Sequence, residues 1–178
     1  IDSEKSFKSP STSLIGLLKL FSESISKESK KIHANNIKLK FIGDTSLLTK
    51  ALQIKIKEIE KETSRNKRLV LNVALNYGGR LDIVNSVNTF YNNKKKIKKI
   101  TEKDINSGLY TKGQSDVDLL IRTGGQQRMS NFLLWQSAYA ELFFSKKLWP
   151  DFDEKIFVNA LYFFQNTERK FGSVSKST

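Results

Sequence analysis

Hydrophobic and polar residues follow two different spacings along the 178-residue chain. Where apolar residues recur every three or four positions, the spacing predicts amphipathic helices, at about 14–35, 46–62, 80–92, 102–109 and 153–170, with another beginning at Ser130. Short apolar or alternating runs predict strands at 37–42, 69–75, 119–122 and 141–144. Because helices separate the predicted strands, the pattern indicates an α/β fold with a mostly parallel central sheet flanked by helices.

This order of elements also indicates where a ligand would bind. We interpret residues 1–178 as a single domain, because that length can bury a sizeable core and no internal repeat divides it. The strand at 69–75 is apolar enough to be buried on both faces. Ligands of open parallel sheets bind beyond the carboxyl ends of the strands, so the loops after the strands are the first candidates.

Composition narrows the class of protein. Hydrophobic residues make up 38% of the chain and charged residues 28%, which is typical of a globular domain. The absence of cysteine excludes disulfides, a thiolate nucleophile and cysteine-ligated metal. The sequence has no apolar run long enough to span a membrane, and residues 1–13 do not resemble a signal peptide. We therefore expect a cytoplasmic protein, and peripheral contact with a membrane stays open.

The net charge of +13 suits nucleic acid, an anionic membrane or a phosphorylated substrate, and it also suits simple solvation. We interpret the lysine-rich run at 94–99 as a solvated loop, with a phosphate or membrane contact as the alternative. No aromatic residues interleave this run, so it offers no stacking platform for bases. We therefore expect no nucleic-acid partner.

The loop after the third predicted strand carries the most chemical information. Gly124 and Gly125 permit positive φ and would leave their backbone amides unobstructed. Arg122 and Arg128 bracket them with permanent, forked cations that match phosphate oxygens. Ser130 can cap the helix predicted there or donate to the same anion, and that helix would add its own N–H groups. The loop predicts a phosphate or diphosphate site, and a plain turn with two surface arginines is the alternative.

A longer pattern around this loop resembles the cis-prenyltransferase family, most closely its bacterial undecaprenyl diphosphate synthases. The matching blocks are DLLIRTGG at 118–125, SNFLLWQ at 130–136, YAEL at 139–142, LWPDF at 148–152, HANN at 33–36, FIGD at 41–44, NYGGR at 76–80 and RKFG at 169–172. Together they extend over nearly the whole chain, and several are highly specific. The loop lacks a Walker lysine, so a P-loop is excluded.

The resemblance implies roles for particular residues. Arg122, Arg128 and Ser130, with the two glycines between them, correspond to the residues that bind the isopentenyl diphosphate headgroup. Glu141 corresponds to a carboxylate that helps to hold Mg²⁺, a hard cation that needs oxygen ligands. A salt bridge is the alternative for Glu141, because an unpaired charge in an apolar run would be costly.

By the same resemblance, the activity is cis-condensation of isopentenyl diphosphate with an allylic diphosphate such as farnesyl diphosphate. The product would be a long-chain, undecaprenyl-type polyprenyl diphosphate, a lipid delivered to the membrane. Mg²⁺ is the implied cofactor and a homodimer the implied assembly. Two rival functions compete with this one: a non-catalytic partner subunit of a heteromeric cis-prenyltransferase and, against the expectation above, a basic nucleic-acid-binding module.

Several positions qualify the resemblance. Gln126 stands where the family usually has an acidic residue, which would weaken a hydrogen bond made there. Arg169 and Lys170 match a basic tail that reaches the partner subunit's active site. Residues 14–25 and 69–75 would wall the tunnel for the growing prenyl chain, or form ordinary core. His33, the sole histidine, is interpreted as structural or as a surface residue.

The start of the sequence departs most from the family pattern. Family members begin with a strand and a Gly-rich turn whose aspartate binds Mg²⁺ and the allylic diphosphate, and residues 1–178 contain no such motif. We therefore expect an N-terminally incomplete chain that lacks the catalytic aspartate and is inactive by itself. Ser3 and Phe7 fall in the motif of the family's mobile lid, where Ser3 and Pro10 match the pattern but most positions between them do not.

Overall fold

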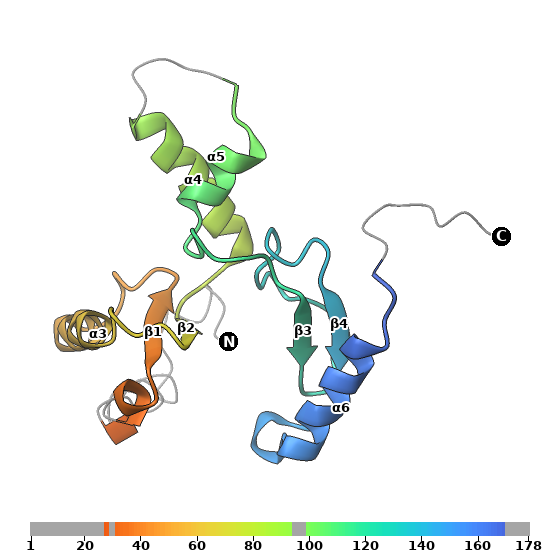
Figure 1. Cartoon of the computed structure of the whole chain (residues 1–178). Coiled ribbons are helices and arrows are strands. Elements are labelled where there is room, and N and C mark those ends of the chain that lie inside the picture. The colour runs from red at the N-terminus through yellow and green to blue at the C-terminus, as the bar shows by residue number, and fades with distance from the viewer. Residues whose placement is uncertain (1–26, 29–30, 94–98, 170–178) are drawn as a thin grey trace. The chain divides into compact units, whose positions relative to one another are not determined.

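The computed structural model describes residues 27–28, 31–93 and 99–169 (Figure 1). The chain groups into two compact units, one up to Lys112 and one from Gly113 onward. Each unit contains one pair of parallel strands with helices beside it. The α/β class and the parallel strand pairing predicted from the sequence are therefore confirmed.

The N-terminal unit is built on β1 (Ile37–Ile42) and β2 (Leu69–Ala74). The two strands pair in parallel, from Ile37 beside Leu69 to Ile42 beside Ala74. Helix α3 (Lys50–Glu62) connects them, and α4 (Gly79–Asn93) and α5 (Glu102–Gly108) follow. These elements agree with the predicted ones, except that α3 begins four residues later than the predicted 46.

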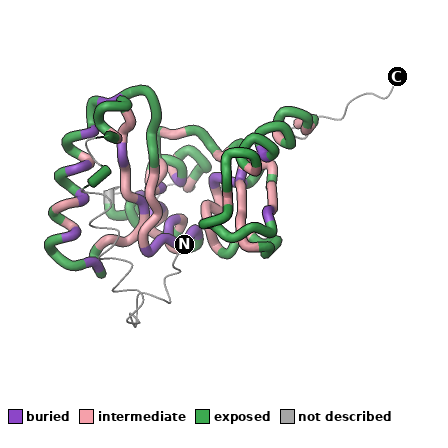
Figure 2. Tube along the Cα trace, turned by 90° about the horizontal axis from the view of Figure 1, so that it is seen from below, coloured by how far each residue is buried: buried purple, intermediate pink, exposed green. Residues whose placement is uncertain are grey.

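Helix α3 forms because one side of it is apolar and its first turn is capped. The side chain of Thr49 accepts a hydrogen bond from the amide of Leu52, which satisfies one of the first free donors of the helix. Leu52 and Ile56 are buried, and Ile59 packs against Leu39 of β1, which places the core of this unit between α3 and the sheet (Figure 2).

Polar side chains from α3 and the turn after it cover one edge of β1. Glu60 Oε1 accepts a hydrogen bond from the amide of Phe41 at 2.8 Å, and Thr63 Oγ1 accepts one from the amide of Leu39 at 3.1 Å. These bonds satisfy donors that a neighbouring strand would otherwise take. β2 differs from the prediction that both of its faces are buried, because its first residues are exposed, 53% for Leu69 and 41% for Leu71.

The C-terminal unit is built on β3 (Leu119–Arg122) and β4 (Glu141–Phe144), followed by the 3₁₀ turn η1 (Trp149–Asp151) and helix α6 (Glu154–Gln165). The strands pair in parallel. The aromatic rings of Phe143 and Phe163 lie 5.7 Å apart and fasten α6 to β4. The predicted strands and the last helix are thus present, and α6 is shorter than the predicted 153–170.

One predicted element of this unit is wrong. The chain after Ser130 forms a series of turns and no helix. Ser130, Asn131 and Leu133 adopt φ values of 45°, 63° and 45°, in the left-handed region that a right-handed helix cannot include. The apolar spacing of this segment is therefore not accompanied by a helix.

Other predictions fall on residues outside the described part of the chain. Residues 31–34 are helical, in keeping with the predicted first helix, but the tunnel segment 14–25 lies outside the described residues. Ser3 and Phe7 of the lid motif, residues 94–98 of the lysine-rich run and Lys170 also lie outside. Among the helices described, none is long and apolar enough to cross a membrane.

Candidate functional site

The loop after β3, residues 122–130 and here called the arginine loop, is closed by its own first residue. Arg122 ends β3, and its Nη1 donates to the backbone oxygen of Arg128 and, over 2.8 Å, to Oγ of Ser130. One guanidinium thus holds both ends of the loop together. The structure brings together the three residues that the resemblance assigns to a diphosphate headgroup, at the carboxyl end of a parallel strand.

The two glycines of the arginine loop serve its backbone conformation. Gly124 and Gly125 adopt φ values of 88° and 75°, which L-residues rarely take. Their amides are occupied, because that of Gly124 donates to the carbonyl of Lys147 at 2.7 Å and that of Gly125 to the carbonyl of Ser145 at 2.9 Å. The predictions that these amides, and the N-terminus of a following helix, are open to an anion are therefore wrong.

The two arginine side chains of the arginine loop donate hydrogen bonds to neutral acceptors. Nη1 of Arg128 donates to Oε1 of Gln126 at 2.6 Å, so Gln126 keeps a hydrogen bond at the position where an acidic residue is usual. Within the described part of the chain, neither Arg122 nor Arg128 forms an ion pair. Two arginines placed by neutral acceptors keep their full charge available for an anion, which is the arrangement that pre-organised electrostatic binding requires.

Glu141 lies at the opposite end of the strand pair. It opens β4 beside Leu119, whereas Arg122 pairs with Phe144. At about 3.3 Å per residue, three residues separate the two positions by ~10 Å along the strands. The side chain of Glu141 is half-buried, and no hydrogen bond or ion pair of its carboxylate occurs among the described residues, so the salt-bridge alternative finds no support there. The structure does not bring Glu141 to the arginine loop.

Arg169 forms contacts near the amino ends of β3 and β4. Its Nη1 lies 2.6 Å from Oδ1 of Asp118, its Nη2 donates to the carbonyl of Tyr139 at 3.4 Å, and its guanidinium lies 5.4 Å from the ring centre of Phe164. The carbonyl of Asp118 also accepts the amide of Glu141 at 2.9 Å. Asp118 therefore joins the starts of both strands to the segment after α6.

No side-chain cluster of the described residues forms a ready metal cage. In the segments that the structure describes, no three His, Cys, Asp or Glu side chains group together as metal ligands. His33 is exposed, and its Nδ1 lies 3.4 Å from Nδ2 of Asn66 in the N-terminal unit. That placement agrees with a surface role for His33.

The N-terminal unit also has loops at the carboxyl ends of its strands. The amide of Asp44 donates to the carbonyl of Asn76 at 3.3 Å, and Nδ2 of Asn76 donates back to the carbonyl of Asp44 at 3.2 Å. Buried Asp82 accepts the hydroxyl of Tyr77 at 2.8 Å and the amide of Tyr110 at 2.9 Å. These bonds close the loops on one another.

Two cavities of about 350 Å³ each adjoin the carboxyl end of β1 and share Phe41, Glu60 and Tyr110 in their walls. Lys38 and Lys40 line one of them together with Glu60. Because both signs of charge are present, the lining does not select a class of ligand. The arginine loop is therefore the stronger candidate site.

Two features of the site were not predicted from the sequence. The carbonyls of Ser145 and Lys147 hold the glycines, and no sequence signal could identify them, because every residue carries a carbonyl. The partner of Gln126 was also not predicted, and its amide oxygen accepts a hydrogen bond from Nη1 of Arg128 at 2.6 Å.

Comparison with known proteins gives consistent matches over the chain. The family model for undecaprenyl diphosphate synthase matches residues 3–172. A farnesyl-diphosphate-specific ditrans,polycis-undecaprenyl-diphosphate synthase of Pasteurella multocida is 44% identical over 178 residues, which cover 98% of this chain and 74% of that protein. An isoprenyl transferase of Prochlorococcus marinus is 44% identical over 169 residues, covering 93% and 62%.

Solved structures agree with these relatives. A probable undecaprenyl diphosphate synthase from Campylobacter jejuni superposes with a TM-score of 0.87 at 32% identity, over 96% of this chain and 80% of that one. Lavandulyl diphosphate synthase from Lavandula x intermedia, solved with dimethylallyl diphosphate, gives the same TM-score and identity over 96% and 76%.

Proposed function

This chain belongs to the undecaprenyl diphosphate synthase family and is an enzyme of the cis-prenyltransferase type that elongates prenyl chains, and we propose that its arginine loop binds the diphosphate of isopentenyl diphosphate. The second substrate is an allylic diphosphate, and farnesyl diphosphate is the first candidate because the Pasteurella relative is named for it. The product is a long-chain, undecaprenyl-type polyprenyl diphosphate.

One observation carries the substrate proposal: the pair of arginines whose acceptors in the described chain are all neutral. Arg122 donates to a carbonyl and to Ser130, and Arg128 donates to Gln126. A diphosphate would add the missing negative charge without displacing a carboxylate first. By fixing the diphosphate end of the substrate, the loop positions the reacting double bond, and such positioning supplies much of the rate in a bimolecular reaction.

The substrate proposal is tested by kinetics of the full-length protein. We expect Arg128→Gln to raise the KM for isopentenyl diphosphate about 10-fold or more, because a charge-assisted hydrogen bond contributes about 1.5–3 kcal/mol. Arg65→Gln is the matched control, since Arg65 is an exposed arginine of the N-terminal unit with no side-chain bond to the described residues. Equal KM values for the two variants would disprove the proposal.

Mg²⁺ is the proposed cofactor, and Glu141 is the residue proposed to hold it. Its half-buried carboxylate has no partner among the described residues, and Mg²⁺ commonly takes one or two carboxylates together with substrate phosphates and water. When bound, the ion would neutralise diphosphate oxygens. Because Glu141 and the arginine loop lie at opposite ends of the strands, the two proposals need separate tests.

A magnesium titration of activity tests this role. We expect Glu141→Gln to weaken the apparent Mg²⁺ affinity about 10-fold, because the substitution removes the charge and keeps the shape. Asp151→Asn, which removes an exposed carboxylate of the same unit, should leave the titration unchanged. An unchanged titration in Glu141→Gln would show that the metal lies elsewhere.

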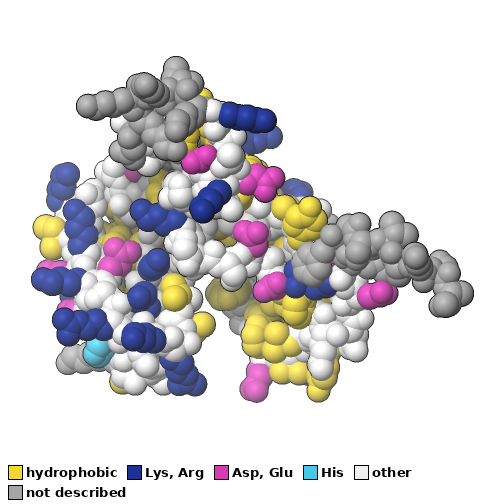
Figure 3. All heavy atoms as spheres, turned by 45° about the horizontal axis from the view of Figure 1, so that its top comes forward, with side chains coloured by type: hydrophobic (Ala, Val, Ile, Leu, Met, Phe, Trp, Pro, Cys, Tyr) yellow, Lys and Arg dark blue, Asp and Glu magenta, His cyan; other side chains and the backbone are white. Residues whose placement is uncertain are grey.

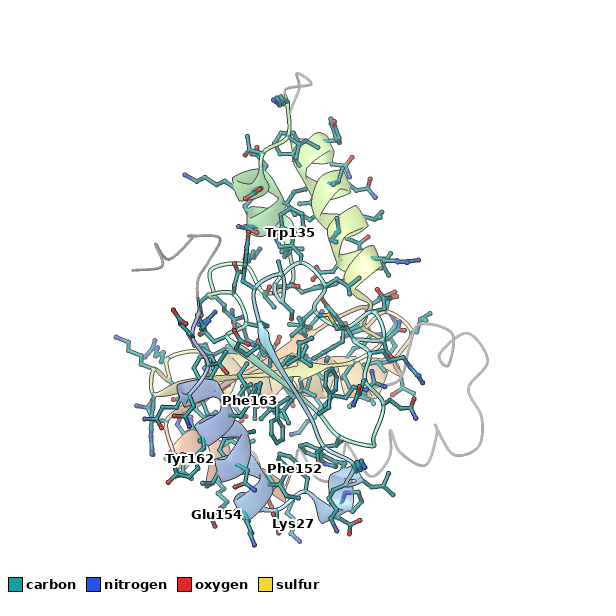
Figure 4. All side chains as sticks on the ribbon, turned by 90° about the vertical axis from the view of Figure 1, so that its right-hand side faces the viewer. Lys27, Trp135, Phe152, Glu154, Tyr162 and Phe163 are labelled. Atoms are coloured by element: carbon teal, nitrogen blue, oxygen red, sulfur yellow. The ribbon has the colours of Figure 1, made fainter. Side chains whose placement is uncertain are left out.

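The proposed assembly is a homodimer, and helix α6 supports it. One side of α6 packs inward through buried Ala160 and through Phe163. Other apolar side chains of α6 are exposed, with Phe157 45% exposed, Leu161 44% and Tyr162 60%. Figure 4 labels Tyr162 and Phe163 on this helix, and Figure 3 shows hydrophobic side chains gathered over the C-terminal unit. Exposed apolar side chains that gather on one helix are normally covered, and a second copy would cover them.

Sedimentation of the full-length protein tests the dimer. Leu161→Glu should shift it to the monomer, because a buried carboxylate without a partner is costly at an interface. Asn159→Glu adds the same charge to α6 at an exposed polar position and should leave the dimer intact. A dimer that tolerates Leu161→Glu would place the contact on another surface.

We also propose a cytoplasmic protein that touches the membrane peripherally to deliver its lipid product. Leu148 and Trp149, at the start of η1, support this contact, because both residues are largely exposed, at 63% and 75%. Flotation with liposomes of anionic phospholipid should lose signal in Trp149→Ser. A non-catalytic partner subunit is the weaker reading, since the comparisons give it no support and the arginine loop is intact.

A further inference from the structure

The bend after β4 is joined to the arginine loop by its backbone. The amide of Ser145 donates to the carbonyl of Arg122 at 2.8 Å, and the carbonyls of Ser145 and Lys147 accept the two glycine amides. A Cβ placed on Gly125 would lie 3.9 Å from Cα of Lys146. Lys146 and Lys147 are thus fixed against the arginine loop at the carboxyl end of the strands.

Both lysines add uncompensated charge at this place. Their side chains are exposed, and within the described chain neither ammonium forms a hydrogen bond or an ion pair. The carboxylates of Asp118 and Glu141 lie at the other end of the strand pair, and Asp118 is paired with Arg169. The end of β3 and β4 therefore carries four cations, two of them arginines, and none has an ionic partner among the described residues.

We propose that Lys146 and Lys147 extend the arginine loop into a four-cation surface that captures the diphosphate substrate. This inference rests on the proposed function of the loop. The lysines attract the substrate at a distance, because ammonium groups on flexible stems act as point charges and lack the fork of a guanidinium. Such charges raise the rate of encounter, and with it the affinity at low salt, and both effects fall as the ionic strength rises.

The test compares two double variants of the full-length protein. Lys146→Gln/Lys147→Gln should lower kcat/KM for isopentenyl diphosphate about 3- to 10-fold at low ionic strength, with kcat unchanged. Near 1 M salt, where the Debye length is about 3 Å, the difference from wild type should disappear. Lys61→Gln/Lys103→Gln removes the same total charge from exposed positions on α3 and α5 and should have little effect at any salt concentration.

Two results would overturn the proposal: equal behaviour of the two double variants, or a loss in kcat that persists at high salt. Binding of inorganic diphosphate, measured by calorimetry at low and high salt, keeps the test independent of turnover. If wild type binds diphosphate but does not elongate isopentenyl diphosphate, the proposed substrate is wrong. In that case weaker binding by Lys146→Gln/Lys147→Gln alone, confined to low salt, still supports the capture surface, and equal binding removes it.

Discussion

The two pairs of parallel strands end in loops of opposite character. At the ends of β1 and β2, Asp44 and Asn76 exchange hydrogen bonds, and residues 76–79 are buried. A Cβ on Gly43 would lie 2.1 Å from the carbonyl oxygen of Leu75. At the end of β3, residues 125–128 are exposed, and a Cβ on Gly124 would meet no atom within 4 Å.

The difference shows that strand topology alone does not make a binding site. Both loops follow parallel strands and both use glycine at positive φ, 107° at Gly43 and 88° at Gly124. In the N-terminal unit the glycine allows two backbones to touch, and the polar groups bind one another. In the C-terminal unit the glycine turns the chain back, and the arginine charges face outward without ionic partners in the described chain. The second arrangement therefore leaves positive charge available for a substrate.

Substituting alanine for Gly43 and for Gly124 should give the largest difference between the two loops, measured as the free energy of unfolding. We expect Gly43→Ala to lower the free energy of unfolding by about 4 kcal/mol, because overpacking against backbone adds to the cost of positive φ. Gly124→Ala should cost only about 1–2 kcal/mol, since positive φ is its whole penalty. Urea unfolding of the full-length variants measures both, and similar losses would mean that the loops do not differ in packing.

Removal of Asp82 should have the next largest effect on stability. Asp82→Ala leaves the hydroxyl of Tyr77 and the amide of Tyr110 without their acceptor, which should cost about 3 kcal/mol of unfolding free energy. Asp116→Ala is the control, because Asp116 is exposed and has no hydrogen bond among the described residues. A loss of unfolding free energy below 1 kcal/mol would show that the loops of the N-terminal unit do not depend on the Asp82 carboxylate.

In the arginine loop, substitution should lower activity more than it lowers the stability of the fold. Arg122→Ala removes a cation and both bonds that close the loop, so we expect kcat/KM for isopentenyl diphosphate to fall about 100-fold. The midpoint of urea unfolding should change little, because the side chain is only half-buried and its two bonds lie in an exposed loop. Unfolding at much lower urea would instead make Arg122 a structural residue.

The smallest effect concerns the residue that orients Arg128. Gln126→Met removes the acceptor of the 2.6 Å hydrogen bond and should raise the KM for isopentenyl diphosphate about 5-fold. Gln126→Glu keeps an acceptor and should restore most of the affinity. Gln127→Met is the matched control, because Gln127 is the exposed neighbour without a hydrogen bond in the described chain. In an Arg128→Gln background the effect of Gln126→Met should vanish, and a persistent effect would contradict positioning through Arg128.

The sequence by itself determined the elements whose signal is local. The strands at 37–42 and 119–122 and the helix α4 were predicted almost to the residue, because apolar spacing and turn residues act over a few positions. The same local chemistry identified Arg122, Arg128 and Ser130 as one site. Their family resemblance added the reaction, which spacing cannot specify.

Tertiary structure decided what depends on residues distant in the chain. The apolar spacing after Ser130 resembles that of a helix, yet the backbone forms turns with left-handed residues there. The start of β2 is exposed because the burial of a strand depends on which elements lie beside it. The sequence predicted unobstructed amides at Gly124 and Gly125, but in the folded chain they donate to the carbonyls of Lys147 and Ser145. Glu141 lies away from the arginine loop because of the register of β3 and β4. The backbone pairing places Glu141 beside Leu119 at the start of β3, and Phe144 beside Arg122 at its end.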